Sequence, residues 1–263
     1  MKITFYGYNA FIIDTSDKTI AIDPGADLYF FRFKSLIPKN LWKEITHIFI
    51  THGDPDHHWY TDKISEASNA EVICNKNMVK EINGNELMLG PRSKGLAFTK
   101  KINNIHTISF GEKIEVDEMK ITGVKAEHGP ITFKLGPFSK TLYPGPDERM
   151  GHGSIGFKIY IDNMNIVNLG DTLLHTSEWK VLENCDVLMI PIGGKVPHNT
   201  MDEKEALEAV ELLKPKLVIP CHYNCPALFS KKYNPADDNY FREGVEKMGH
   251  RCAVLERGES IKI

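Results

Sequence analysis

The sequence predicts an α/β protein with two sheets face to face and helices outside them, a four-layer αββα sandwich. Three observations support this class. Short runs of β-branched and aromatic residues recur in both halves of the 263 residues, with turn residues between them. Helical patterns fall between and after these runs, so each half can cover one sheet with helices. No Pro- or Ser-rich linker separates the halves, which predicts a single domain over residues 1–263.

The first half opens with three short apolar runs that turn residues interrupt, which predicts three consecutive strands. A fourth run is too short and too β-branched for a helix. An amphipathic segment then predicts a helix, followed by a fifth strand and at most a short second helix. The expected strands are 3–6, 10–13, 19–22, 47–50 and 71–74, and the expected helices are 59–67 and 78–82.

The middle of the chain repeats the strand pattern and then loses it. We expect a meander of three strands, at 105–110, 113–116 and 119–124. The segment 127–153 is polar and rich in Gly and Pro, and we expect its part 135–153 to be a long loop without regular structure. Long loops of this kind often carry function, which makes Tyr143 and Arg149 candidate substrate contacts.

The last third alternates strands with helices. Thr200 and Glu203 match a capping box and predict a helix start, and Pro215 ends that helix. A second helix is expected at 239–248. The expected strands are 155–161, 165–169, 186–190, 217–219 and 252–255.

Composition excludes several classes of protein. The net charge of −3 shows no basic excess, which disfavours nucleic acid as a partner. No run of 18 apolar residues occurs, so no membrane span is expected. The first residues resemble a strand and not a signal peptide, and the five cysteines are odd in number and widely spaced. These observations predict a reduced, cytoplasmic protein.

The 11 histidines are unevenly placed, and several gather after one expected strand. Residues 51–58 read Thr-His-Gly-Asp-Pro-Asp-His-His, and the Gly and Pro favour a loop. Alternate residues of an extended loop point to one side, so His52, Asp54 and Asp56 can converge, with His57 beside them. Bare carboxylates would repel one another there, whereas a cation reverses that electrostatics. The cluster therefore predicts a site for a divalent first-row metal.

Three further residues of the same chemical types follow expected strands elsewhere in the chain. They are His128, Asp171 and His222. In layered α/β folds, sites form at such strand ends. We therefore expect these side chains to join the cluster after residue 50.

This pattern resembles the metallo-β-lactamase superfamily, whose signature loop is H-x-H-x-D-H after a strand. It is similar in particular to the branch of metal-dependent hydrolases that includes the ascorbate-6-phosphate lactonase. The resemblance covers nearly the whole chain, and the motifs occur in the family's order. They lie at 11–24, 48–57, 126–129, 168–172, 190–194 and 218–223.

The resemblance implies a dinuclear centre with a hydroxide on two divalent cations. One metal would take His52, Asp54 and His128, and the other Asp56, His57 and His222, with Asp171 as the bridge. Asp56 would orient the hydroxide or share its proton. Asp23 would support the signature loop from behind through hydrogen bonds. His198 resembles a histidine that protonates leaving groups in phosphodiesterase relatives.

Asp54 departs from the family pattern, which has His at this position. A carboxylate makes the first site harder and more anionic, which moves the metal preference from Zn toward Mn or Fe. It also resembles the flavodiiron proteins, although this chain is too short for their flavodoxin domain. A third option is a weak first site and a mononuclear protein.

One further motif is discounted. His152 lies in a G-x-G-x-x-G match at 151–156 that precedes an expected strand, whereas a dinucleotide loop must open a helix. We therefore expect the match to be accidental, with His152 as a residue that can line the pocket.

The leading hypothesis is a metal-dependent hydrolase acting on a small ester, lactone or phosphodiester that can carry a phosphate. One alternative is a diiron protein that handles oxygen or nitric oxide, suggested by Asp54. The other is a non-catalytic scaffold that binds metal or ligand, against which the intact ligand set argues. By analogy with the fold, a homo-oligomer is expected as an alternative to a monomer.

Overall fold

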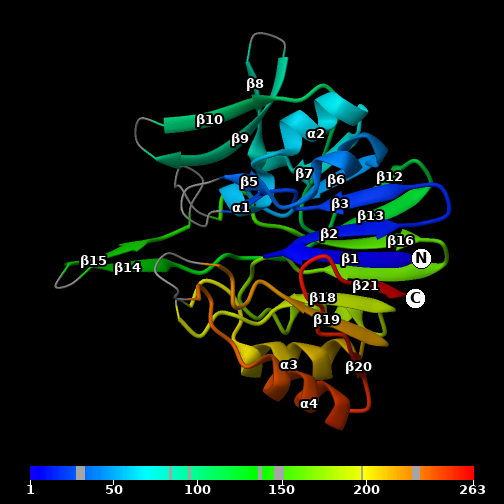
Figure 1. The fold of residues 1–263 in the computed structure, drawn as a ribbon, viewed down its shortest axis with the longest axis vertical. Helices are drawn as coiled ribbons and strands as arrows, with labels where there is room; N and C mark the ends of the chain where they lie inside the picture. The colour runs from blue at the N-terminus through cyan, green and yellow to red at the C-terminus, as the bar shows by residue number, and fades with distance from the viewer. Residues whose placement is uncertain are drawn as a thin grey trace.

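A computed structural model of the chain describes residues 1–27, 33–82, 85–93, 96–135, 138–144, 151–196, 198–226 and 232–263. Two seven-stranded sheets pack together, and helices cover their outer faces (Figure 1). The predicted αββα sandwich is confirmed. Among the described helices, none is long and apolar enough to cross a membrane.

The first sheet is built mainly from the N-terminal half of the chain. Its strands, in spatial order, are β11 (Ile105–Ile108), β7 (Glu71–Asn75), β6 (His47–Ile50), β3 (Thr19–Ile22), β2 (Ala10–Asp14), β1 (Lys2–Gly7) and β21 (Ser260–Lys262). Helix α2 (Thr61–Ser68) and the 3-10 helix η2 (Lys39–Glu44) cover its outer face. The C-terminal strand β21 pairs with β1, so the two chain ends lie side by side (Figure 1).

The second sheet comes from the C-terminal half. Its strands, in order, are β12 (Lys113–Val116), β13 (Met119–Val124), β16 (Gly156–Ile161), β17 (Met164–Asn168), β18 (Val187–Pro191), β19 (Leu217–Cys221) and β20 (Arg251–Cys252). Its outer face is covered by α3 (Glu203–Leu213), α4 (Asp238–Lys247) and the 3-10 helix η4 (Glu178–Leu182).

Strands β18 and β19 are apolar and buried at every position because both of their faces are covered. In β18, Val187 and Met189 face the core between the sheets, while Leu188 and Ile190 face the helices. Phe49 and Phe157 meet edge to face between the sheets, with ring centroids 5.1 Å apart. The two sheets therefore share one hydrophobic core, and each has a second core beneath its helices.

Three smaller sheets extend the sandwich. They are β8 (Val79–Ile82) with β9 (Asn85–Ser93) and β10 (Leu96–Lys101), the hairpin of β14 (Ile131–Leu135) and β15 (Phe138–Leu142), and the pair β4 (Ala26–Asp27) and β5 (Lys34–Ser35). The β14–β15 hairpin projects from the body of the molecule (Figure 1). The expectation of a structureless 135–153 segment was therefore wrong in its first part.

Other local expectations also failed. Of the helix expected at 78–82, only Met78 is helical, at the end of the 3-10 helix η3 (Lys76–Met78), while the remaining residues form β8 and pair with β9. The 105–108 strand is no part of a meander, since it pairs in parallel with β7 of the first sheet. Helix α3 is capped by Asp202, whose carboxylate accepts from the Glu205 N–H, while Glu205 accepts from the Asp202 N–H. Thr200 instead hydrogen-bonds to Thr172 outside the helix.

Strand direction decides where a site can form. Strands β3, β6, β7 and β11 run parallel to one another in the first sheet, and β17, β18, β19 and β20 do so in the second. The carboxyl ends of parallel strands lie at one edge of each sheet, where loops from many strands meet. The predicted ligands follow such ends: β6 precedes His52, β17 precedes Asp171, and β19 precedes His222.

Candidate metal centre

Four imidazoles and three carboxylates converge at this edge of the sandwich. Their ligand atoms form three groups, in each of which all atoms lie within 4.8 Å of one another. The groups are His52 with Asp54 and His128, Asp56 with His57 and His222, and His52 with His57 and Asp171. The structure thus brings together all seven residues that the sequence singled out.

The first group is centred on Asp54. Its Oδ2 lies 3.4 Å from His52 Nε2 and 3.7 Å from His128 Nε2. Its other oxygen, Oδ1, accepts the Gly151 N–H at 3.1 Å. Only a residue without a side chain fits there, because a Cβ on Gly151 would lie 2.4 Å from the His128 Cβ. One carboxylate oxygen is therefore held by the backbone, and the other faces the imidazoles.

The second group is centred on Asp56, whose Oδ2 lies 3.5 Å from His57 Nε2 and 3.5 Å from His222 Nε2. Asp171 lies between the groups. Its Oδ2 is 2.9 Å from His222 Nε2, 3.6 Å from His57 Nε2 and 3.9 Å from His128 Nε2. Asp171 thus contacts histidines of both groups.

The local fold of the signature loop differs from the expected extended loop. Residues Pro55–His58 form a single helical turn, α1. Pro55 is its first residue, where a missing N–H costs nothing and the fixed φ favours helix. The turn carries Asp56 and His57 to the second group, while Asp54 stays with the first. The expectation that Asp56 points to the same side as His52 and Asp54 was therefore wrong. The expected convergence of these side chains at one site does occur.

Several buried atoms of the cluster have no hydrogen-bond partner in the described part of the chain. They are the Nε2 atoms of His52, His57 and His222 and the Oδ1 of Asp171. Each such group would normally cost about 1–3 kcal/mol of stability. Nitrogen and carboxylate oxygen are the donors that divalent first-row metals take, so the residues fit one or more such cations.

The charges of the cluster are strongly coupled. Burial alone would raise the pKa of Asp171, but His222 and His57 beside it hold that pKa well below its usual range. Burial alone would lower the pKa of His222, yet Asp171 outweighs it and raises the pKa to about 9. The carboxylates are therefore ionised at neutral pH, which is the form that binds a cation.

Comparison with known proteins agrees with this geometry. A family model described as a β-lactamase superfamily domain matches residues 2–222. A UPF0173 metal-dependent hydrolase of Nanoarchaeum equitans is 31% identical over 267 residues, covering 100% of both chains. The chain belongs to the β-lactamase superfamily, among its UPF0173 metal-dependent hydrolases. A UPF0173 relative in Desulforamulus reducens is 29% identical over 266 residues, again covering 100% of both chains.

Solved structures share the fold of this superfamily member. Igni18, a metallo hydrolase of Ignicoccus hospitalis, superposes with a TM-score of 0.70 at 23% identity, covering 99% of this chain and 97% of Igni18. CmlA, a diiron β-hydroxylase of Streptomyces venezuelae, gives 0.63 at 14% identity, covering 100% of this chain and 54% of CmlA. At identities this low, both likenesses show the fold alone.

Behind the cluster of imidazoles and carboxylates, a buried polar network joins the two sheets. Asn9 Nδ2 donates to Asp23 Oδ2 at 2.6 Å and to Asn168 Oδ1 at 3.1 Å, and Asn168 donates back to Asn9 at 3.0 Å. Asp23 also accepts from Thr51 and contacts His57 Nδ1. The position of Asp23 fits its expected supporting role. Sequence reasoning missed Asn9 and Asn168, because single asparagines near strand ends resemble ordinary turn residues.

The other candidate residues lie away from the cluster or beside it. The His198 side chain is 54% exposed and pairs with Glu205 at 3.0 Å, and no described hydrogen bond joins it to the cluster. His152 is buried, and its carbonyl accepts the Gly53 N–H at 2.9 Å. Tyr143 is 66% exposed, and Arg149 lies outside the described residues. The G-x-G-x-x-G match runs into strand β16, as expected of an accidental match.

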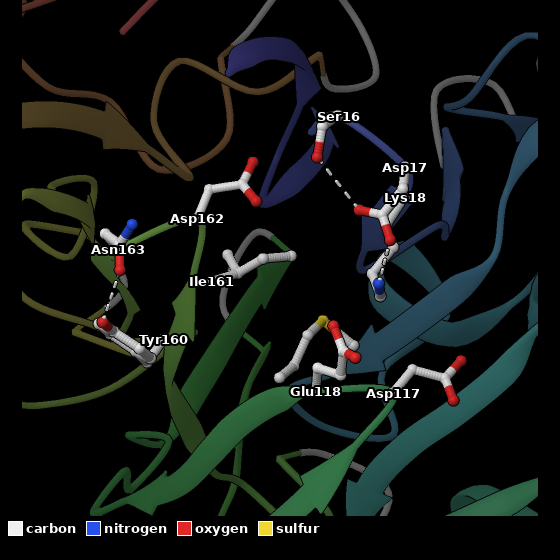
Figure 2. A pocket seen from close by; sticks show the side chains of 10 residues that line it. Ser16, Asp17, Lys18, Asp117, Glu118, Tyr160, Ile161, Asp162 and Asn163 are labelled. Carbon is white, nitrogen blue, oxygen red and sulfur yellow. Dashed lines mark hydrogen bonds and ion pairs between the residues drawn. The ribbon is translucent and has the colours of Figure 1, made fainter.

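A separate cavity of about 290 Å³ lies at the opposite end of the sandwich (Figure 2). The β2–β3, β12–β13 and β16–β17 turns form it, at strand ends remote from those that carry the metal centre. Its acidic lining residues are Asp17, Asp117, Glu118 and Asp162. The cavity contains none of the residues that the sequence predicts as ligands.

Proposed function

We propose that this chain hydrolyses a small ester, lactone or phosphodiester with the help of two divalent cations. The observation that carries the proposal is Asp171, which lies within 4 Å of histidines of both ligand groups. A shared carboxylate between two ligand sets is the arrangement that a two-metal site requires. Two further observations support the same proposal: relatives in the family are named metal-dependent hydrolases, and buried nitrogen and oxygen atoms of the cluster have no hydrogen-bond partner among the described residues.

In this proposal, one cation takes the first ligand group and the other takes the second, with Asp171 between them. The groups are His52, Asp54 and His128, and Asp56, His57 and His222. Such cations, when bound, activate water as the nucleophile and stabilise charge on the substrate oxygen. Zinc, manganese and iron all suit nitrogen and carboxylate ligands, and the oxygen of Asp54 favours the two harder metals.

The proposal gives the chain's own residues distinct roles. Burial would raise the pKa of Asp56, but His57 and His222 lower it strongly, so its carboxylate stays ionised and can orient a water by accepting a hydrogen bond from it. Asp23 fixes the His57 ring from behind. His198 is the proposed proton donor to the leaving group, because its chain passes against Gly129, next to His128, and Glu205 can stabilise its charged form.

The test is metal analysis joined to a substrate screen. We expect the purified chain, reconstituted with Mn, Fe or Zn, to hold about two equivalents and to hydrolyse at least one class of ester, lactone or phosphodiester. Asp171→Asn should lose metal and activity while remaining folded. The control is Asp186→Asn, because Asp186 pairs with Lys216 at the other end of β18. A wild-type chain that binds no metal after reconstitution would contradict the proposal.

A second candidate function follows from Asp54. Its Oδ2 faces His52 and His128, which gives the first site an oxygen ligand where the family pattern has nitrogen. A carboxylate-rich site suits iron that reacts with oxygen or nitric oxide. The iron-loaded protein would then consume either gas when a reductant is supplied. No uptake of gas and no spectral change, together with hydrolysis by the same preparation, would leave the hydrolase as the function.

We also propose that residues 1–263 act as a single domain in a reducing, cytoplasmic setting. All five cysteines lie among the described residues, and no disulfide joins any two of them. Cys221 and Cys225 are buried beside the metal centre, but neither belongs to the described ligand groups. A small-molecule substrate is the proposed partner, and sedimentation would determine whether the chain forms a homo-oligomer.

A further inference from the structure

We infer that a pair of buried amides, Asn199 and Asn234, holds the His222 ring and can turn to stabilise the form of the ring that binds a cation. The inference rests on the proposed function, because it takes His222 as a metal ligand. Asn234 Nδ2 lies 2.9 Å from His222 Nδ1 and 3.2 Å from Asn199 Oδ1. The side chains of all three residues are shut off from solvent, with at most 1% exposure.

A histidine that binds metal through Nε2 needs the lone pair of that atom, so its proton must sit on Nδ1. The group facing Nδ1 must then accept a hydrogen bond. In the structure, Asn234 presents its NH2 group to Nδ1, and Asp171 lies 2.9 Å from Nε2. This arrangement uses Nδ1 as an acceptor, so a single proton on the His222 ring would sit on Nε2, which faces the carboxylate.

Nothing locks the two amides in that orientation. The remaining polar atoms, Asn234 Oδ1 and Asn199 Nδ2, have no hydrogen-bond partner among the described residues. A half-turn of each amide exchanges oxygen and nitrogen without changing the shape of the side chain. Asn234 Oδ1 would then accept from His222 Nδ1 and from Asn199 Nδ2, so the number of hydrogen bonds is unchanged. The pair can therefore serve the metal-binding form of His222 at no cost in hydrogen bonds.

The surrounding backbone fixes the position of this pair. His222 has φ of +48° and donates its N–H to the Tyr8 carbonyl at 2.7 Å. Asn234 has φ of +52° and accepts the Asn224 N–H at 2.7 Å. A Cβ on Gly193 would lie 2.6 Å from the Asn234 Cβ, so glycine is required there. The ring and the amide are thus held by main-chain contacts, which leaves the amide rotation as the adjustable element.

Asn199 also contacts the residue that follows His128 of the first ligand group. Its carbonyl accepts the Gly129 N–H at 2.7 Å, and Gly129 follows His128 directly. The His198 side chain, its neighbour, points to Glu205 and solvent. The segment that sequence analysis singled out for His198 therefore reaches the metal centre through Asn199, which links the two halves of the site. We assign Asn199 and Asn234 as positioning residues.

The test compares Asn234→Asp with Asn234→Gly. Asp and Gly both tolerate the positive φ at position 234. Asp retains an acceptor facing His222 Nδ1, whereas Gly removes the side chain. We expect Asn234→Gly to lower the affinity for Mn or Zn, measured by chelator competition, about 10- to 100-fold, and Asn234→Asp to bind as tightly as the wild type. In the zinc-loaded wild type, nitrogen NMR should show the His222 proton on Nδ1.

The control is Asn163→Gly. Asn163 also has positive φ, of +60°, and it is exposed in the β16–β17 turn at the opposite end of the sandwich, where it accepts from the Tyr160 hydroxyl. The control variant should leave cation affinity unchanged. Equal loss of affinity in both Asn234 variants would show that a donor is needed and overturn the inference. Cation affinity in Asn234→Gly equal to that of the wild type would also overturn the inference. An unmodified chain that binds no cation would instead overturn the proposed function.

Discussion

Asp23 Oδ2 lies 2.7 Å from His57 Nδ1, and both side chains are fully buried. The carboxylate accepts from Nδ1 of the imidazole, so Nε2 is the ring nitrogen that faces Asp56 and Asp171. The same carboxylate accepts from the N–H and hydroxyl of Thr51, at 2.7 and 2.6 Å. One side chain at the end of β3 therefore fixes both the start of the signature loop and a ring within it.

Asp23→Asn should weaken metal binding. Asn fits the φ of +45° at this position, but both Asp23 oxygens accept hydrogen bonds, so the NH2 group of Asn must face a donor, either the Thr51 N–H or His57 Nδ1. We expect about a 10- to 100-fold loss in cation affinity, measured by chelator competition. Asp14→Asn is the control, because Asp14 pairs with Lys2 at a partly exposed position. Equal affinity in both variants would contradict this role of Asp23.

Gly151→Ala should empty the first ligand group selectively. The new methyl would lie 2.4 Å from the His128 Cβ, and it would move the N–H that holds Asp54. Gly249→Ala is the matched control, since Gly249 also has positive φ but a methyl group there would meet nothing within 4 Å. Both variants should lose roughly 1–2 kcal/mol to backbone strain. Metal analysis should find about one equivalent fewer in Gly151→Ala alone, and an unchanged metal content would count against this arrangement.

Asn9→Ala should destabilise the fold and loosen the site together. Asn9 donates to Asp23 and Asn168, and its Oδ1 accepts from Asn168 and from the Cys221 thiol. Leaving these buried groups unpaired should cost about 2 kcal/mol in the free energy of unfolding, measured in urea. Asn239→Ala on α4 provides the control, because Asn239 is exposed and contacts only Arg242 among the hydrogen bonds described. A loss no larger than in this control would refute the bridging role.

The cysteines should resist alkylation in the native protein at pH 8. Burial raises the pKa of Cys185 and of Cys252 to about 12, so both thiols stay protonated and unreactive there. Burial also raises the pKa of Cys221 well above its usual range. Iodoacetamide should label these three thiols only after unfolding, as mass spectrometry would show. Rapid labelling of Cys221 in the folded protein would mean that it is more accessible than its burial indicates.

Much of the fold could be predicted because burial on both faces leaves a local pattern. The strands at 19–22 and 47–50 were predicted with their observed bounds, since each is a continuous apolar run too short for a helix. The β11 strand was predicted, but its sheet was not. Its parallel pairing with β7 joins Ile105 to Val72, a contact that periodicity does not encode. The pairing of β14 with β15 was missed because these strands lie within a longer segment, 127–153, whose overall polar, Gly- and Pro-rich composition resembles a loop.

The sequence by itself determined the superfamily and the seven side chains that converge, because ligand types recur in a fixed order after strands. The resemblance also implied their division into two groups, and the tertiary structure decided the local fold by which the chain achieves it. The helical turn of α1 sends Asp56 to one group and leaves Asp54 with the other. It also decided which residues support them, since Asn9, Asn199 and Asn234 act through contacts between distant segments. Ligand identity is local chemistry, whereas ligand orientation depends on neighbours that folding alone brings together.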